Sequence, residues 1–139
     1  MAIRSRTSRL AHILERAGLA TAGATCGLFV AAHLVKEGNP ALMSLGFVFA
    51  MMIGGAIGFY LGIDLPPRDE AAAGAGRVDP VEMLSAVGTF LAPVVALVAV
   101  ANIILDIDPR PGSALVLALG WLLGVAMQII AGLTARFTR

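Results

Sequence analysis

Four long stretches without a formal charge constrain the fold of this chain more than any other feature. They contain 19, 26, 23 and 25 residues and lie between Arg16 and Lys36, Glu37 and Asp64, Glu82 and Asp106, and Arg110 and Arg136. A helix needs about 20 apolar residues to cross the roughly 30 Å hydrocarbon core of a bilayer. Each stretch is therefore long enough to span a membrane once.

A water-soluble helical bundle is the alternative to a membrane protein. Soluble domains carry about a quarter charged residues and keep a polar face on each surface helix. Here only 14% of the residues are charged, and the four stretches have no polar face. The sequence therefore predicts an all-α integral membrane four-helix bundle made of two helical hairpins. The predicted spans are Ala17–Val35, Ala41–Ile63, Met83–Leu105 and Ala114–Ala135.

Local signals mark the ends of these spans. Asn39 before Pro40 is typical of an N-cap followed by proline at the first helical position, and Asp79 before Pro80 repeats the pattern. Gly38 can close the first span in the left-handed conformation, and Ser113 is a candidate cap for the fourth. The chain then divides into a basic amphipathic N-terminus, a first hairpin, a linker, a second hairpin and a tail, at residues 1–16, 17–63, 64–80, 81–135 and 136–139.

The distribution of lysine and arginine predicts the orientation, because cytoplasmic segments are enriched in both. Only Lys36 and Arg110 fall on one side of the predicted topology. The other side holds Arg4, Arg6, Arg9, Arg16, Arg68, Arg77, Arg136 and Arg139. Both termini and the linker are therefore predicted to be cytoplasmic, in a bacterial inner membrane.

The N-terminal segment has features of a targeting sequence. An Arg- and Ser-rich leader is also typical of mitochondrial presequences, so the mitochondrial inner membrane is the alternative location. The apolar run that follows is longer than the core of a signal peptide, and we interpret it as a retained span. In a helix, one side of this segment would carry apolar residues while its arginines face lipid headgroups. The apolar residues are Ile3, Leu10, Ile13, Leu14 and Ala17.

Small residues at four-residue spacing recur in every span. Since lipid tails are as apolar as leucine, membrane helices associate where small residues allow close approach and polar groups bond between helices. The sequence predicts packing strips within the four-helix unit. A homo-oligomer or partner interface on the second-span strip is the alternative. The strips are Gly54, Gly58 and Gly62; Gly23, Gly27 and Ala31; Gly120 and Gly124; and Gly88, Ala92 and Ala96.

Polar residues inside the spans are few. Embedded ionisable residues usually mark function, yet no Asp, Glu, Lys or Arg lies near the centre of a span. His33, Asn102 and Ser44 are predicted near the outward ends. His33 is a candidate cofactor ligand for a quinone or a porphyrin metal, or else a group that bonds between helices or reaches interfacial water.

Gln128 and Pro93 are the remaining interior signals. The Gln128 amide is expected to bond across helices to Thr25, Tyr60 or a backbone carbonyl freed near Pro93, and Pro93 is expected to kink its helix. Lining a pore is the alternative role for Gln128.

No catalytic residue, metal site or identifiable cofactor emerges from the sequence. The single cysteine, Cys26, excludes an internal disulfide, and a net charge of +1 gives no case for nucleic-acid binding. The bilayer, other membrane subunits and a second copy of the chain are the predicted partners. The preferred interpretation is a non-catalytic accessory or structural subunit of a larger membrane complex. A small oligomeric channel or transporter is the first alternative, and a redox or lipid-modifying protein that uses His33 is the second.

Overall fold

The computed structural model describes residues 2–38, 42–62, 80–107 and 112–137, with side chains from residue 12 onward, and in these residues the regular secondary structure is helical throughout. The four helices are α1 (Ala2–Lys36), α2 (Leu45–Gly62), α3 (Pro80–Ile104) and α4 (Ser113–Phe137). Each is long and apolar enough to cross a membrane. The all-α, four-helix prediction is confirmed.

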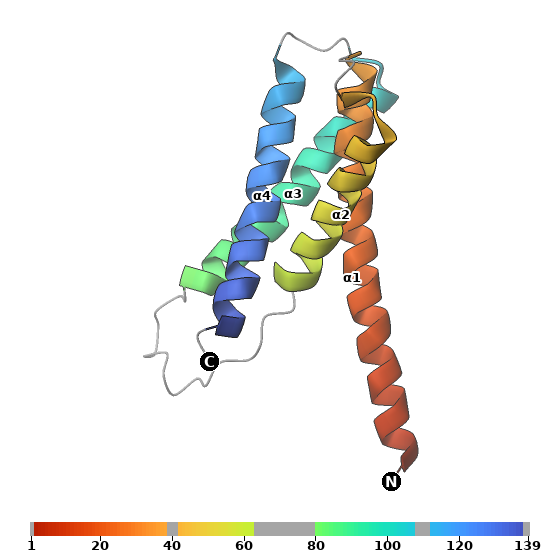
Figure 1. The fold of residues 1–139 in the computed structure, drawn as a ribbon, viewed down its shortest axis with the longest axis vertical. Coiled ribbons are helices and arrows are strands. Elements are labelled where there is room, and N and C mark those ends of the chain that lie inside the picture. Colours follow the sequence, from red (N-terminus) through yellow and green to blue (C-terminus); the bar gives the residue numbers. More distant parts are fainter. Residues whose placement is uncertain (1, 39–41, 63–79, 108–111, 138–139) are drawn as a thin grey trace.

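The helices form an antiparallel bundle (Figure 1). Helix α1 packs most extensively against α2, and α3 against α4, while α2 also contacts α4 and α1 contacts α3. We call one end of the bundle the Lys36 end, where α1 and α3 finish and α2 and α4 begin. The opposite end, where α2 and α4 finish and α3 begins, is the Gly62 end.

Helix α1 differs from its prediction in length. The expected span Ala17–Val35 is the second half of one continuous helix of 35 residues, which is about 52 Å long at 1.5 Å per residue. Its first half extends beyond the other helices at the Gly62 end (Figure 1). Helix α1 closes at Gly38, whose positive φ of 77° and bond from its N–H to the Val35 carbonyl at 3.0 Å match the predicted C-terminal signal.

Helix α2 is shorter than its prediction and begins at Leu45 instead of Ala41. Ser44 sets this start, because its Oγ accepts a hydrogen bond from the Phe47 N–H at 3.2 Å. A serine in this position satisfies one of the free donors of a helix N-terminus. Ser44, predicted as a polar intramembrane group, therefore acts as an N-cap. The Asn39-Pro40 signal lies outside the described residues.

The other two helices begin close to where the sequence places them. Pro80 is the first residue of α3, and Ser113 is the first of α4. Pro93 lies inside α3, which is helical from end to end. The kink expected at this proline stays a prediction.

Candidate functional site

The closest helix contact joins α1 to α2 through glycines. A methyl group added at Gly23 would overlap the backbone carbonyl of Gly55, and one added at Gly27 would overlap the carbonyl of Met51. At both points the backbones of the two helices lie in direct contact, which only a residue without a side chain permits.

Helix α4 makes similar contacts on two sides. On the α3 side, a Cβ at Gly124 would lie 2.9 Å from the Ala92 nitrogen, and one at Gly88 would lie 2.6 Å from the Gly124 carbonyl oxygen. On the α2 side, a Cβ at Gly132 would overlap the Leu61 carbonyl. Small residues thus bring α4 close to both α2 and α3.

The remaining predicted glycines also face helices of the same chain. A Cβ at Gly58 would lie 2.9 Å from Gln128 Oε1, and one at Gly62 would lie 2.5 Å from Gln128 Cβ. A Cβ at Gly54 would lie 3.7 Å from Trp121, an ordinary contact, whereas one at Gly120 would lie 3.3 Å from Val95 Cγ2, a tight contact. Gly55 did not stand out in the sequence, because it is adjacent to the Gly54 strip and nothing local shows which of the two neighbours faces α1.

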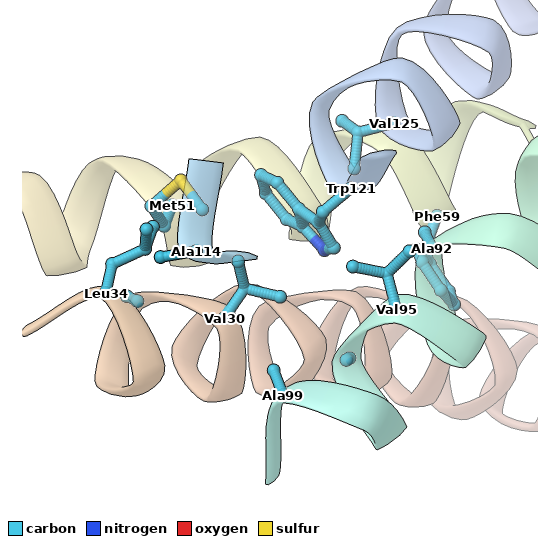
Figure 2. Close-up of a cluster of buried hydrophobic side chains, with 12 residues drawn as sticks. Val30, Leu34, Met51, Phe59, Ala92, Val95, Ala99, Ala114, Trp121 and Val125 are labelled. Carbon is cyan, nitrogen blue, oxygen red and sulfur yellow. The ribbon is translucent and has the colours of Figure 1, made fainter. Parts of the chain in front are cut away.

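Trp121 fills the centre of the bundle. Its side chain is almost fully buried and lies between Val30 of α1, Met51 of α2 and Val95 of α3 (Figure 2). The indole Nε1 has no hydrogen-bond partner among the described residues. Trp121 is therefore the residue around which all four helices meet.

Gln128 is the most deeply buried polar side chain in the described part of the chain, with an exposed fraction of 0%. Its Nε2 donates to Thr89 Oγ1 of α3 at 3.2 Å. The expected bonds to Thr25 or Tyr60 are not made: Thr25 donates to the Thr21 carbonyl, and the Tyr60 hydroxyl accepts from Arg16. The amide therefore links α4 to α3 through Thr89, which lies four residues before Pro93. Its Oε1 lacks a partner among the described residues.

His33 belongs to a polar cluster at the Lys36 end. Its ring is buried, with Nε2 3.7 Å from Oε1 of Glu37, and neither ring nitrogen has a hydrogen-bond partner among the described residues. Glu37 Oε1 in turn accepts from Ser113 Oγ of α4 at 3.4 Å. This cluster links the end of α1 to the start of α4. Asn102 is half-buried near the same end, where its backbone carbonyl accepts from the Ile107 N–H.

Lys36 and Asp106 form an ion pair between α1 and the residues that follow α3, with Nζ 2.6 Å from Oδ1. Asp106 is 90% exposed and has a positive φ of 48°, which aspartate tolerates better than most residues. The hydrogen bond and the charge of Lys36 lower the pKa of the Asp106 carboxyl.

We expect an NMR titration to place the pKa of Asp106 below the ordinary value of about 3.9. A Lys36→Met substitution should raise this pKa toward the ordinary value, because the bond to Lys36 is its main cause. Since the pKa is lowered in the folded state, the stabilisation is present above the unfolded-state pKa and is lost as the pH falls through the folded-state pKa. An unchanged pKa in the Lys36→Met variant would contradict this assignment.

Two side chains bind the last carbonyls of α2 at the Gly62 end. Arg136 Nη1 donates to the Leu61 carbonyl at 2.9 Å and to the Gly132 carbonyl at 2.8 Å, and the buried Ser85 Oγ donates to the Gly62 carbonyl at 2.5 Å. The last four carbonyls of a helix lack intrahelical donors, and cations are favoured beside them. Arg136 and Ser85 were not predicted as site residues, because their partners lie 75 and 23 residues away in sequence.

Arg16 and Tyr60 connect α1 to α2 near the same end. Arg16 Nη1 donates to the Tyr60 hydroxyl at 3.1 Å, and the guanidinium carbon lies 5.4 Å from the centroid of the Tyr60 ring. These distances fit a hydrogen bond and a cation–π contact. They mark the level at which α1 joins the bundle.

Together these groups form a packed bundle with polar contacts at both ends. In the described ranges, no group of three or more His, Cys, Asp or Glu side chains could hold a metal ion. Cys26 is half-buried with a free thiol. Comparison with protein-family models, curated proteins and solved structures finds no match to this chain.

Proposed function

We propose that this multi-pass membrane protein is a non-catalytic accessory or structural subunit of a larger membrane complex. The observation that carries the proposal is the close packing between the helices in the part of the chain that the structure describes. Glycine-to-backbone contacts and the Trp121 side chain occupy the space between the helices. Such an interior provides a rigid unit and leaves the outer surface as the part that meets other molecules.

The outer surface supports this role because it is apolar along all four helices. Large hydrophobic side chains that are more than half exposed occur on each of them. In a membrane such side chains face lipid or a neighbouring subunit, since neither contact exposes them to water. Examples are Ile13 and Leu14 in α1, Phe49 and Ile53 in α2, Phe90 and Leu97 in α3, and Leu119 and Leu123 in α4.

The proposed orientation places the Gly62 end in the cytoplasm of a bacterial cell. Arg16 and Arg136 lie at this end, and Lys36 lies at the other. The excess of arginine at the Gly62 end supports the assignment under the positive-inside rule. Both termini of the chain would then be cytoplasmic.

Native mass spectrometry after mild detergent extraction from the protein's own membrane tests the proposal. We expect complexes that contain this chain together with different polypeptides in fixed stoichiometry. A preparation that contains only copies of this chain would contradict the accessory role.

A small oligomeric channel or transporter is the second candidate, and Gln128 is the observation that favours it. An amide oxygen without a partner is costly to bury in a low-dielectric interior, and such groups can line a polar path. Homo-oligomers in the same mass spectra would favour this candidate, and mixed complexes would favour the accessory subunit.

A further inference from the structure

The N-terminal part of α1 lies outside the bundle. Helix α1 begins at Ala2. Along the helix from there, the first side-chain hydrogen bond to α2 among the described residues is the one from Arg16 to Tyr60. We call residues 2–15 the N-terminal extension. In the described part of the chain no other helix lies beside it (Figure 1). At 1.5 Å per residue, its 14 residues correspond to about 21 Å of helix.

The composition of the extension is basic and apolar together. Its sequence contains Arg4, Arg6 and Arg9 and a single acidic residue, Glu15. Among its described side chains, Ile13 is 61% exposed and Leu14 is 70% exposed. His12 and Glu15 are also exposed and lie 3.8 Å apart. A segment with three arginines and two exposed large apolar side chains is suited to a surface that is both anionic and apolar.

We propose that the N-terminal extension binds the anionic phospholipid surface of the membrane that α1 spans. The proposal rests on the membrane insertion stated above. Arginines are attracted to acidic lipid headgroups within about one Debye length, and apolar side chains of an amphipathic helix insert below those headgroups. The arginines thus match the headgroup layer of a leaflet, and the apolar side chains match the acyl-chain layer below it.

A lipid surface is favoured over a protein partner because the extension is continuous with the part of α1 that would cross that surface. Arg16 and Tyr60 join α1 to the bundle directly after the extension, so every residue of the extension lies within its length of about 21 Å from this point. A tethered surface acts at a high effective concentration, and weak individual contacts then suffice. A protein partner would have to compete with this surface from solution.

The extension has a place at which to change direction. Gly18 follows it closely, and a Cβ added there would meet no atom within 4 Å. Glycine in a helix interior lowers local helix stability relative to alanine. A bend of α1 at Gly18 would move Arg16 away from Tyr60 and would leave the contacts that Gly23 and Gly27 make with α2 in place.

Spin labels in lipid nanodiscs test the proposal on the full chain. In a Cys26→Ser background, single labels are placed through Leu14→Cys, His12→Cys and Leu28→Cys. Residues 12 and 14 lie about 200° apart around a helix, so a bound extension immerses only one of them. The accessibility of each label to a water-soluble nickel complex and to oxygen is measured in phosphatidylcholine alone and with phosphatidylglycerol added.

When phosphatidylglycerol is added, we expect the collision rate of the Leu14 label with the nickel complex to fall severalfold. The collision rate of the His12 label should stay unchanged, because this label remains in water. The immersion should vanish in about 1 M salt, where the Debye length is about 3 Å, and in the Arg4→Gln, Arg6→Gln, Arg9→Gln triple variant. A Leu14 label that stays in water, or immersion that survives both treatments, would overturn the proposal. The Leu28 label distinguishes failure of lipid binding by the extension from failure of membrane insertion, because exposure of this label to nickel would refute the insertion of α1.

Discussion

Replacing Gly23 by alanine should lower the free energy of unfolding by about 1–3 kcal/mol, the range found for overpacked protein interiors. The added methyl group would overlap the Gly55 carbonyl of α2. A backbone atom cannot move aside as the end of a flexible side chain can, so the two helices must separate. Steric trapping or titration with a denaturing detergent measures the change in reconstituted protein.

Gly46→Ala is the matched control for this substitution. Gly46 lies in α2 and, like Gly23 of α1, is within a helix, but a Cβ there would meet no atom of another helix within 4 Å. Its replacement should leave stability unchanged or slightly improved, because alanine has the higher helix propensity. Equal destabilisation by Gly23→Ala and Gly46→Ala would show that the α1–α2 contact does not depend on close approach.

Replacing Arg136 by methionine should destabilise the bundle by about 1.5–3 kcal/mol, the contribution of one hydrogen bond to a charged group, because, of its bonds to the Leu61 and Gly132 carbonyls, only the one to Leu61 joins two helices. Methionine keeps much of the apolar stem and removes the donors to the Leu61 and Gly132 carbonyls. The end of α2 then loses a partner for a carbonyl that no residue of its own helix can satisfy. The same unfolding assay, performed on the wild type and the variant, gives the difference.

Two further variants separate the carbonyl contacts from the charge of Arg136. Arg136→Lys keeps the charge but lacks the forked donors, so it should recover only part of the loss. Lys36→Met removes an ion pair whose carboxylate is 90% exposed, and its effect should be much smaller. If Lys36→Met destabilised the protein as much as Arg136→Met, net charge would explain both effects better than the carbonyl contacts.

The helix termini show which features can be predicted from a few neighbouring residues. Gly38 and Pro80 were recognised from the sequence alone, because a left-handed cap and a proline at the first helical position depend only on the backbone of a few neighbouring residues. The start of α2 was placed too early, since the Asn39-Pro40 signal competes with a second cap at Ser44. From the sequence, Ser44 was predicted only as a polar group near the end of the span, and its role as a cap became visible in the structure.

By itself the sequence determined that this chain forms four apolar helices of membrane-spanning length, because long charge-free stretches leave few other ways to satisfy the backbone. Only the tertiary structure decided which side of each helix faces inward. A soluble helix reveals its inner side by having a polar outer one, and these helices are apolar all round. The contacts of Gly55 with Gly23, of Gln128 with Thr89 and of Arg136 with Leu61 join residues far apart in sequence, so no local pattern records them.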